Sequence, residues 1–220
     1  MKTKQSKQPW EIPYHKVLTT EELAQIALEN FKAKQKAFQN GDRESMIDWM
    51  IFNTSCWGLR ISESAQLECG QVFVGTNIAH IRLTKTKGLK PRDVFIGPIF
   101  SEFLQEYLEW KQSQGEPVGE HAPFFYSWKT ETFMTPEGLR KAFKRAVKKA
   151  NITRRITPHS GRHTLGTHMV EVNIKALQKL LGHSSLATTE VYIHVLNPKI
   201  QEFVEKYEFL IYATIGKKRK

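Results

Sequence analysis

The spacing of hydrophobic and polar residues predicts helices in the first quarter of the chain. Between residues 20 and 38, apolar positions recur every three or four residues, which is typical of an amphipathic helix. Thr19 comes directly before this run and Glu22 follows three residues later, a capping-box pattern that sets the helix start. Residues 44–57 are rich in Met, Ile, Phe and Trp and predict a second, more buried helix.

The hydrophobic period changes after residue 62. Ser62 is expected to cap a third helix over residues 63–72. Short runs in which hydrophobic and polar positions alternate come next, and they predict a small antiparallel sheet. These runs are "QVFVG" (71–75), "NIAHIRLT" (77–84) and "RDVFIGP" (92–98), with a basic turn, "KTKGLKP" (85–91), between the last two.

Helical spacing returns beyond residue 99. Thr135 and Pro136 open one of these helices and Asn151 ends it, because Thr is a favoured N-cap and Pro suits the first helical position. A second Thr-Pro pair, at residues 157–158, opens the next helix in the same way. The expected helices cover residues 100–114, 136–150, 158–172, 174–183, 188–197 and 199–215. We therefore predict an α+β fold: a mainly helical single domain with a small antiparallel β-sheet near its N-terminal third.

Composition and charge restrict the class of protein. The chain has 220 residues, 40% of them hydrophobic, which is enough for one sizeable core. Its formal net charge is +11. A domain this basic most often binds a polyanion, and nucleic acid is the leading candidate. The alternative is a basic surface or tail that serves only solubility.

Cysteine usage and the terminal sequence indicate the compartment. The two cysteines, Cys56 and Cys69, form neither a CxxC pair nor a zinc-ligand series, so we expect reduced core thiols in an intracellular protein. The N-terminal segment is polar and lacks the apolar stretch of a signal peptide. The longest apolar stretch, residues 46–59, is too short to span a bilayer. We predict a soluble, cytoplasmic protein without a membrane contact.

One predicted helix carries an unusual concentration of positive charge. Its apolar residues, Leu139, Phe143, Val147 and Ala150, share one face. No acidic residue lies between Leu139 and Asn151, so the clustered cations repel one another unless an anion relieves them. A face that follows DNA phosphates is the favoured interpretation, and a solvated charged surface is the alternative. The cations are Arg140, Lys141, Lys144, Arg145, Lys148 and Lys149.

Residues 159–195 are rich in histidine, and three kinds of chemistry compete for them. His159 and His163 share a helix face, but a zinc site needs a third ligand, and Arg162 would place a cation between them. An acyl-transfer site around Ser160 lacks the GxSxG elbow and a preceding strand. Phosphoryl transfer fits best, because Arg162 lies one turn after His159 near a helix N-terminus, where both a guanidinium and the helix dipole favour an anion.

These motifs resemble those of the tyrosine recombinases, also called the phage integrase family. The segments "TPHSGRHTLGTHM" and "LQKLLGHSSLATTEVYIHV" are similar to the family's C-terminal signature. "WGLRISESAQLECGQV" resembles its first conserved box, which supplies Arg60, and "RLTKTKGLKPRDVFI" resembles the β-hairpin with the catalytic lysine. That lysine aligns with Lys87, while Lys85 and Lys90 compete for the role and are otherwise candidate DNA contacts. The resemblance runs from about residue 18 to 196.

The resemblance implies a reaction in which a tyrosine attacks a DNA phosphodiester, leaving a 3′-phosphotyrosyl link and a free 5′-hydroxyl. It implies no metal and no cofactor, because the bond energy stays in the phosphotyrosine. Read alone, Tyr192 would be a half-buried core residue. The implied roles are Tyr192 as nucleophile, Arg60 and Arg162 on the non-bridging oxygens, Lys87 as proton donor to the leaving oxygen, His159 as acid or base, His183 as a phosphate hydrogen bond, and Glu63 as active-site support.

The resemblance also predicts the organisation and partners of the chain. We expect a basic flexible arm at 1–17, the catalytic domain at 18–214 and a basic tail at 215–220, with no separate N-terminal core-binding domain. The expected partner is double-stranded DNA with a specific recombination site, bound by a homotetramer on paired sites. The helix at 200–214 either docks on a neighbouring protomer or packs on its own core. A non-catalytic DNA-binding regulator and a type IB topoisomerase-like enzyme are the alternative functions.

Overall fold

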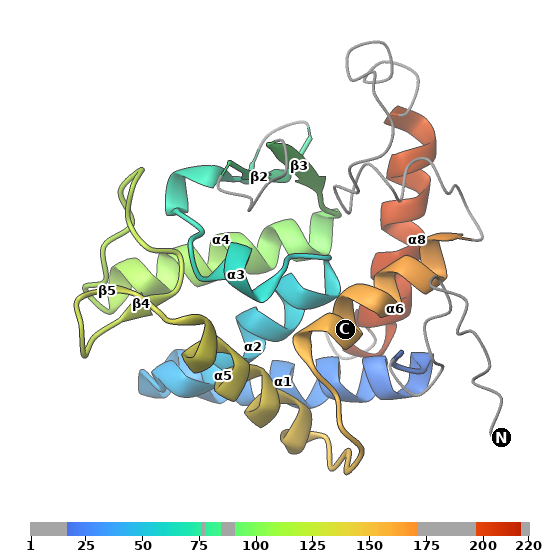
Figure 1. Cartoon of the computed structure of the whole chain (residues 1–220), viewed down its shortest axis with the longest axis horizontal. Coiled ribbons are helices and arrows are strands. Elements are labelled where there is room, and N and C mark those ends of the chain that lie inside the picture. The colour runs from blue at the N-terminus through green and yellow to red at the C-terminus, as the bar shows by residue number, and fades with distance from the viewer. Residues whose placement is uncertain (1–16, 76–77, 85–90, 171–196, 217–220) are drawn as a thin grey trace, which may run out of the picture.

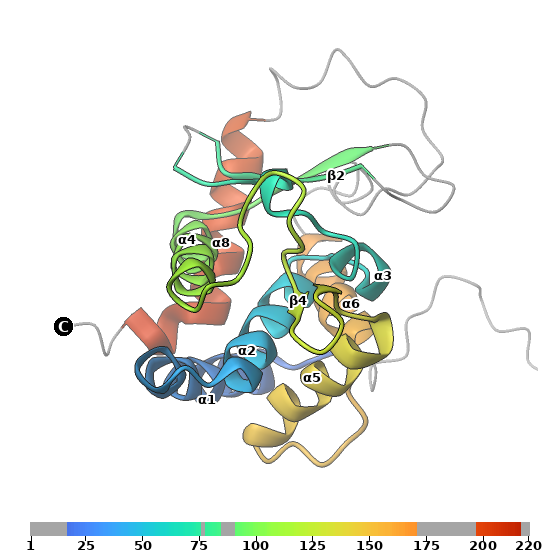
Figure 2. The ribbon, with the colours of Figure 1, turned by 90° about the vertical axis from the view of Figure 1, so that its left-hand side faces the viewer.

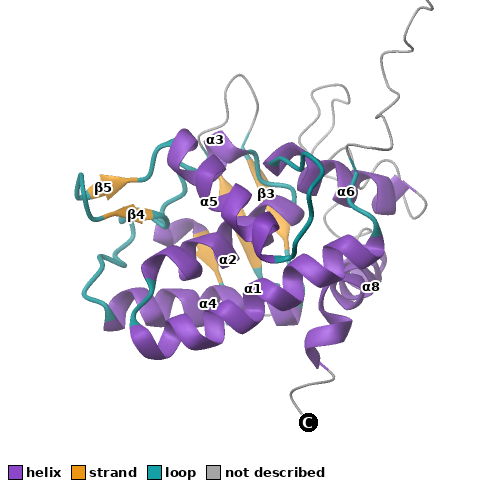
Figure 3. Cartoon of the chain, turned by 90° about the horizontal axis from the view of Figure 1, so that it is seen from below, coloured by secondary structure: helices purple, strands orange, loops and turns teal. Residues whose placement is uncertain are grey.

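The computed structural model describes residues 17–75, 78–84, 91–170 and 197–216, and these form a mainly helical domain (Figure 1). The helices are α1 (Thr20–Asn40), α2 (Arg43–Cys56), α3 (Ile61–Ser64), α4 (Pro98–Ser113), α5 (Pro136–Lys149), α6 (Pro158–Val170) and α8 (Asn197–Gly216), with a 3-10 turn η2 at Cys69–Gln71. Seen from below, helices make up most of the domain, and one pair of short strands lies at its edge (Figure 3). The α+β prediction is confirmed. The helices predicted at 174–183 and 188–197 lie almost wholly outside the described residues.

Local sequence signals set the ends of the first two helices. The Thr19 side chain accepts a hydrogen bond from the Glu22 amide at 3.2 Å, and the Glu22 carboxylate accepts one from the Thr19 amide at 3.0 Å. Gly41 ends α1 in the left-handed conformation, with φ of 68°, which glycine adopts without steric cost. Asp42 then caps α2 by accepting from the Ser45 amide. The capping box predicted for α1 is confirmed.

The predicted antiparallel sheet is present. Its strands β1 (Val72–Phe73), β2 (His80–Leu83) and β3 (Arg92–Phe95) lie in that order. Ile81 pairs with Val72 on one side and Val94 on the other, and all three are buried, so this face of the sheet covers the core. On the outer face, Arg82 lies opposite Asp93 and binds its carboxylate at 3.0 Å. Residues 85–90 of the predicted basic turn lie outside the described residues.

One local prediction was wrong, and one element was not predicted. The third helix begins after Arg60 and ends at Ser64, so Ser62 lies inside it rather than at its N-cap. The Glu63 carboxylate accepts from the Arg60 amide at 2.7 Å, as a glutamate three residues after an N-cap does, so Arg60 is the N-cap. The hairpin formed by β4 (Tyr126–Ser127) and β5 (Thr132–Phe133) lies between the helices expected at 100–114 and 136–150 and was not predicted.

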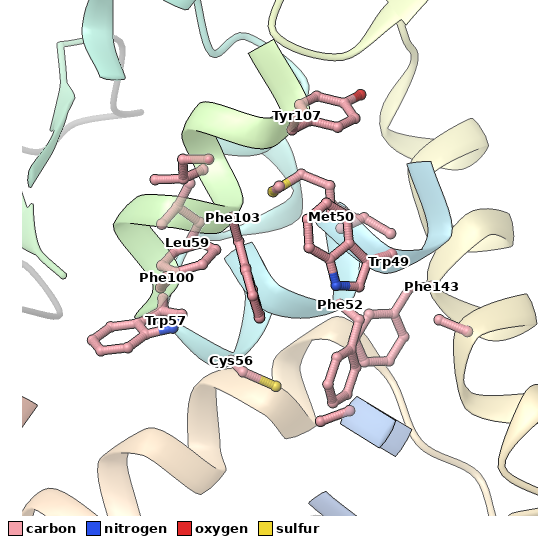
Figure 4. Close-up of a cluster of buried hydrophobic side chains, with 14 of the residues drawn as sticks. Trp49, Met50, Phe52, Cys56, Trp57, Leu59, Phe100, Phe103, Tyr107 and Phe143 are labelled. Carbon is pink, nitrogen blue, oxygen red and sulfur yellow. The ribbon is translucent and has the colours of Figure 1, made fainter. Parts of the chain in front are cut away.

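Helix α2 is the centre of the core (Figure 4). Trp49 and Phe103 of α4 lie with ring centroids 5.2 Å apart, and Phe52 lies 6.1 Å from Phe143 of α5. At the C-terminal end of α2, Trp57 stacks on Phe100 at 5.4 Å. Aromatic pairs of this kind contribute roughly 0.5–1.5 kcal/mol beyond the burial of their area. These contacts hold the end of α2, from which the next functional segment leaves.

Helix α8 packs on the core of its own chain. Its Tyr207 hydroxyl donates to the Cys56 carbonyl at 3.1 Å, and the Tyr212 hydroxyl donates to Asn53 Oδ1 at 2.5 Å. Trp57 Nε1 in turn donates to the Tyr212 hydroxyl at 3.3 Å. Cys56 and Cys69 are free, buried thiols. Within the described part of the chain, no helix has the length and apolar character needed to cross a membrane.

Candidate functional site

The end of α2 and the start of α3 position Arg60. The chain leaves α2 through Trp57 and turns at Gly58, where φ is 89° and favours glycine. Arg60 is therefore placed at the N-cap of α3, and its side chain is 27% exposed. Figure 2 shows α3, α5 and α6 on one side of the molecule, away from α4 and α8. The residues of the site come from this side and from the edge of the sheet above it.

Glu63 is the acceptor around which the site is built. Its buried carboxylate receives Arg60 Nη1 at 2.9 Å and both terminal nitrogens of Arg92, at 2.7 and 2.9 Å. Burial by itself raises the pKa of Glu63, but the hydrogen bonds and charges of Arg92, and then those of Arg60, bring the pKa below its ordinary value. Glu63 is therefore an ionised carboxylate that orients two arginines, as active-site support requires.

Arg162 approaches the same place from α6. Its side chain is buried and donates from Nη1 to the Gly58 carbonyl, so the turn that presents Arg60 also orients Arg162. Burial, and then the charges of Arg60 and Arg92, lower the pKa of Arg162 to about 9, while Glu63 opposes the shift. The guanidinium therefore remains charged at neutral pH. It lies in a positive potential that a bound anion would relieve.

We call Arg60, Arg92 and Arg162 the arginine cluster. Glu63 binds Arg60 and Arg92 and raises the pKa of Arg162, while the charges of Arg60 and Arg92 lower it, so the three guanidinium groups lie within electrostatic range of one another. Guanidinium groups bind phosphate oxygens through paired hydrogen bonds and stay ionised. Among the described residues, no three His, Cys, Asp or Glu side chains come together as a metal site would need. The arrangement is suited to an oxyanion rather than to a cation.

His159 lies one turn before Arg162, at the start of α6. Partial burial lowers the pKa of His159, and the charges of Arg162, Arg60 and Arg140 lower it further. Its ring centroid is 6.0 Å from that of His163. His159 is therefore neutral at neutral pH, the state in which an imidazole can accept a proton.

Gly161 allows α6 to reach the backbone of α2. A Cβ atom at this position would lie 3.2 Å from the Ser55 carbonyl carbon and 3.3 Å from the Cys56 amide nitrogen, which is closer than side chains normally approach. Because both neighbours are backbone atoms, they cannot turn aside. The glycine between His159 and Arg162 thus brings the helix that carries them against the turn that carries Arg60.

Replacing Gly161 by alanine is expected to lower the free energy of unfolding by about 1–3 kcal/mol, the usual cost of overfilling a core. In an unconstrained helix the same change would stabilise the protein by about 0.5–1 kcal/mol. Gly138→Ala in α5 is the matched control, since a Cβ there meets only side-chain atoms at 3.4 Å. Urea denaturation of both variants measures the effect. A stabilised Gly161→Ala protein would contradict the close contact.

The basic face of α5 divides into two groups. The expectation that nothing pairs with these cations considered only the helix itself, and the structure corrects it. The buried carboxylate of Asp48 in α2 accepts Arg145 Nη2 at 2.7 Å and Lys149 Nζ at 2.9 Å. The other four cations, Arg140, Lys141, Lys144 and Lys148, are exposed. Of these, Arg140 binds Glu137 at 3.2 Å.

The structure brings Arg60, Glu63, His159 and Arg162 together, while their roles stay predictions. Lys85, Lys87, Lys90, His183 and Tyr192 lie outside the described residues, so their roles stay predictions. Arg92 was missed. The available signal was the alternation in "RDVFI", which places Arg92 on the same buried face as Val94.

The chain belongs to the phage integrase family, whose sequence profile matches residues 16–198. Its relatives include the tyrosine recombinase XerC of Chlamydia caviae, 34% identical over 140 residues, which cover 63% of this chain and 43% of that protein. The tyrosine recombinase XerD of Staphylococcus saprophyticus is 29% identical over 170 residues, covering 76% of this chain and 55% of the relative. The chain thus spans about half the length of the relatives it matches.

Solved structures share the fold. XerA recombinase superposes with a TM-score of 0.59 at 24% identity, covering 90% of this chain and 66% of that chain. XerH recombinase bound to its difH substrate gives a TM-score of 0.60 at 24% identity, covering 80% of this chain and 48% of that chain. The resemblance stated from the motifs is confirmed at the level of family and fold.

Proposed function

We propose that this chain carries the catalytic part of a site-specific DNA recombinase, which cleaves and rejoins DNA through a 3′-phosphotyrosyl intermediate. The observation that carries the proposal is the arginine cluster around Glu63, with His159 one turn from Arg162. A scissile phosphodiester placed there would meet these guanidinium groups, which would also stabilise the further charge of a five-coordinate transition state. A non-catalytic DNA-binding regulator would have no need of a neutral histidine beside that cluster.

Tyr192 is the proposed nucleophile, on the strength of the family motif. Three of the four other tyrosines in the described residues support this proposal, the fourth being the partly buried Tyr126. Tyr107, Tyr207 and Tyr212 are fully buried, and burial raises the pKa of each hydroxyl well above its ordinary value. Such phenols stay protonated and away from DNA. Lys87, as donor to the leaving oxygen, and His183, as a phosphate ligand, complete the proposed set by the same motif.

The proposal is tested by trapping the covalent intermediate. The protein is incubated with a library of randomised DNA duplexes, each nicked a few nucleotides beyond a fixed phosphodiester so that the cleaved 5′-hydroxyl strand diffuses away. Protein–DNA adducts that survive denaturation are expected, and sequencing their DNA identifies the preferred duplex. Retention of DNA by binding alone, with no adduct from any duplex, would favour the regulator.

The pH dependence of adduct formation is expected to report His159. Because burial and nearby arginines lower its pKa, the neutral base persists to lower pH than in a free histidine, whose pKa is about 6.5. With DNA below saturation, the rate should therefore stay level as pH falls through about 6.5 and decline only at lower pH. His159→Gln should be slower and lack this decline. An unchanged decline in His159→Gln would assign it to another group.

We further propose that the exposed cations of α5 follow the DNA backbone, while Arg145 and Lys149 serve mainly to neutralise Asp48. Among these exposed cations, Arg140 acts on the candidate site directly, because its charge helps to lower the pKa of His159. The exposed positions Lys144 and Lys148 lie one helical turn apart, a spacing that lets both face one DNA strand.

Neutralising Lys144 or Lys148 with glutamine is expected to reduce the slope of log Kd against log salt by about 1 for each residue. Arg145→Gln and Lys149→Gln, on the same helix, are the matched controls. They should change the slope little and lower the melting temperature instead, because each removes a partner of a buried carboxylate. Equal slope changes in all four variants would contradict the division of the face.

We propose a homotetramer on the basis of the family resemblance. Four protomers would hold two recombination sites on double-stranded DNA, with 1–17 as a basic arm, a catalytic domain that runs to the end of α8 at Gly216 because Ile215 is buried in the core, and 217–220 as a basic tail. One face of α8 is committed to its own core through Tyr207 and Ile211. A contact with a neighbouring protomer would therefore use its exposed side, where Phe209 is 67% exposed.

A further inference from the structure

Arg92 lies in the hairpin motif that supplies Lys87, but the motif assigned it no role. It is the first residue of β3, paired with Leu83 at the end of β2, so it lies at the base of the hairpin connection whose sequence contains Lys87. The Arg92 side chain is buried, with 6% exposed, and Glu63 beside it is 3% exposed. A buried arginine on the inner face of a strand is costly unless it makes specific bonds.

The hydrogen bonds at Glu63 form a two-sided bridge. Oε1 accepts Arg92 Nη1 at 2.7 Å and Arg60 Nη1 at 2.9 Å. Oε2 accepts Arg92 Nη2 at 2.9 Å and the Arg60 backbone amide at 2.7 Å. Each carboxylate oxygen thus joins Arg92 to Arg60. Arg92 binds the carboxylate through both terminal nitrogens of its guanidinium. The carboxylate in turn accepts hydrogen bonds from the main chain and the side chain of Arg60.

We propose that Arg92 is a positioning residue for phosphodiester cleavage, which fixes Arg60 through Glu63 and thereby ties the base of the β2–β3 hairpin to the phosphate site. The inference rests on the proposed function of the site. Arg92 reaches Glu63 from the buried side, whereas Arg60 is partly exposed and turned toward the surface. Glu63 therefore joins a buried support, Arg92, to a partly exposed guanidinium, Arg60, that a phosphate could contact.

The consequence is a loss of rate with little loss of binding. Arg92→Met should slow adduct formation by roughly 10–100-fold, the usual effect of removing a residue that orients a site ligand. DNA affinity should stay within about threefold, because most of it comes from contacts with many phosphates. Arg92→Lys keeps the charge but cannot form the paired bonds, so its rate should be intermediate. Equal rates in wild type, Arg92→Met and Arg92→Lys would overturn the proposal.

Two matched variants separate positioning from stability. Arg82→Met removes an arginine of the same sheet whose partner, Asp93, is at the surface, and its rate should stay within about twofold of wild type. Glu63→Met combined with Arg92→Met replaces the buried ion pair by apolar side chains, a change that often preserves folding. Melting temperatures establish that both proteins fold. A folded double variant that forms adduct at the wild-type rate would overturn the proposal.

A modified substrate tests whether Arg92 acts on the phosphate through Arg60. Replacing either non-bridging oxygen of the scissile phosphate, in the duplex recovered by trapping, with a methyl group removes one acceptor. The wild type should be slowed strongly by one stereoisomer. Arg60→Ala and Arg92→Met should both lose that sensitivity, because coupled groups are not additive. A full wild-type response in Arg92→Met would show that Arg60 is held without Arg92.

A measurement without DNA distinguishes failure of this inference from failure of the proposed function. In the free protein, the nuclear magnetic resonance signal of the Arg60 guanidinium reports whether the group is held. Slow solvent exchange of this group in wild type and Arg82→Met, and fast exchange in Arg92→Met, is the expected result. The same exchange in all three proteins would overturn the positioning role, whether or not the wild type forms an adduct.

Discussion

Tyr192→Phe is expected to abolish the covalent protein–DNA adduct while leaving DNA affinity within about threefold. The substitution removes one oxygen atom, which is the atom that would attack phosphorus and remain bound to the 3′ end. A phenol has a pKa of about 10, so it needs nearby cations and a base to attack at neutral pH. The arginine cluster and neutral His159 would supply both. Denaturing electrophoresis after incubation with the nicked duplex measures the adduct.

Tyr126→Phe is the control for that experiment. Tyr126 lies on β4, packed edge-on against Trp128 with ring centroids 5.5 Å apart, and it is only partly buried. Losing its hydroxyl should leave the adduct unchanged. If Tyr192→Phe still forms the adduct, the nucleophile is a different residue, and peptide mapping of the adduct would locate it.

Arg162→Lys should reduce the rate of adduct formation by roughly 100–1000-fold, the effect of removing one preorganised donor to a developing negative charge. A lysine there has one compact ammonium group in place of the fork that donates to the Gly58 carbonyl. The burial and neighbouring arginines that lower the pKa of Arg162 would act on a lysine from a lower starting value. A lysine at position 162 would therefore be partly uncharged and would also lack the hydrogen-bond geometry of the guanidinium group.

The measurement for Arg162→Lys separates rate from affinity. Single-turnover kinetics with saturating duplex should show the loss, while Kd rises by less than about tenfold, since one phosphate contact among many is removed. Arg82→Lys, an exposed position of the neighbouring sheet, should match wild type in both quantities. A lysine variant with the wild-type rate would show that charge alone, without guanidinium geometry, suffices at this position.

Short-range patterns predicted the helices well because helix ends depend on residues within one turn. Thr19 with Glu22, and Thr135 with Pro136, mark helix starts that the structure confirms. The β4–β5 hairpin was missed because each of its strands has two residues, too few for an alternating pattern to appear. The cap assigned to Ser62 was wrong because the Glu63 carboxylate, fixed by a distant arginine, binds the Arg60 amide and so starts the helix after Arg60.

The order and type of the motif residues were determined by the sequence alone: Arg60 and Glu63 in one motif, His159 and Arg162 in another. The tertiary structure decided which charges are available and which are already paired. Arg92 meets Glu63 across 29 positions of the chain, and Arg145 meets Asp48 across 97. Local sequence preferences cannot predict such ion pairs, because the partner of a charged side chain depends on which helices and strands the core brings together.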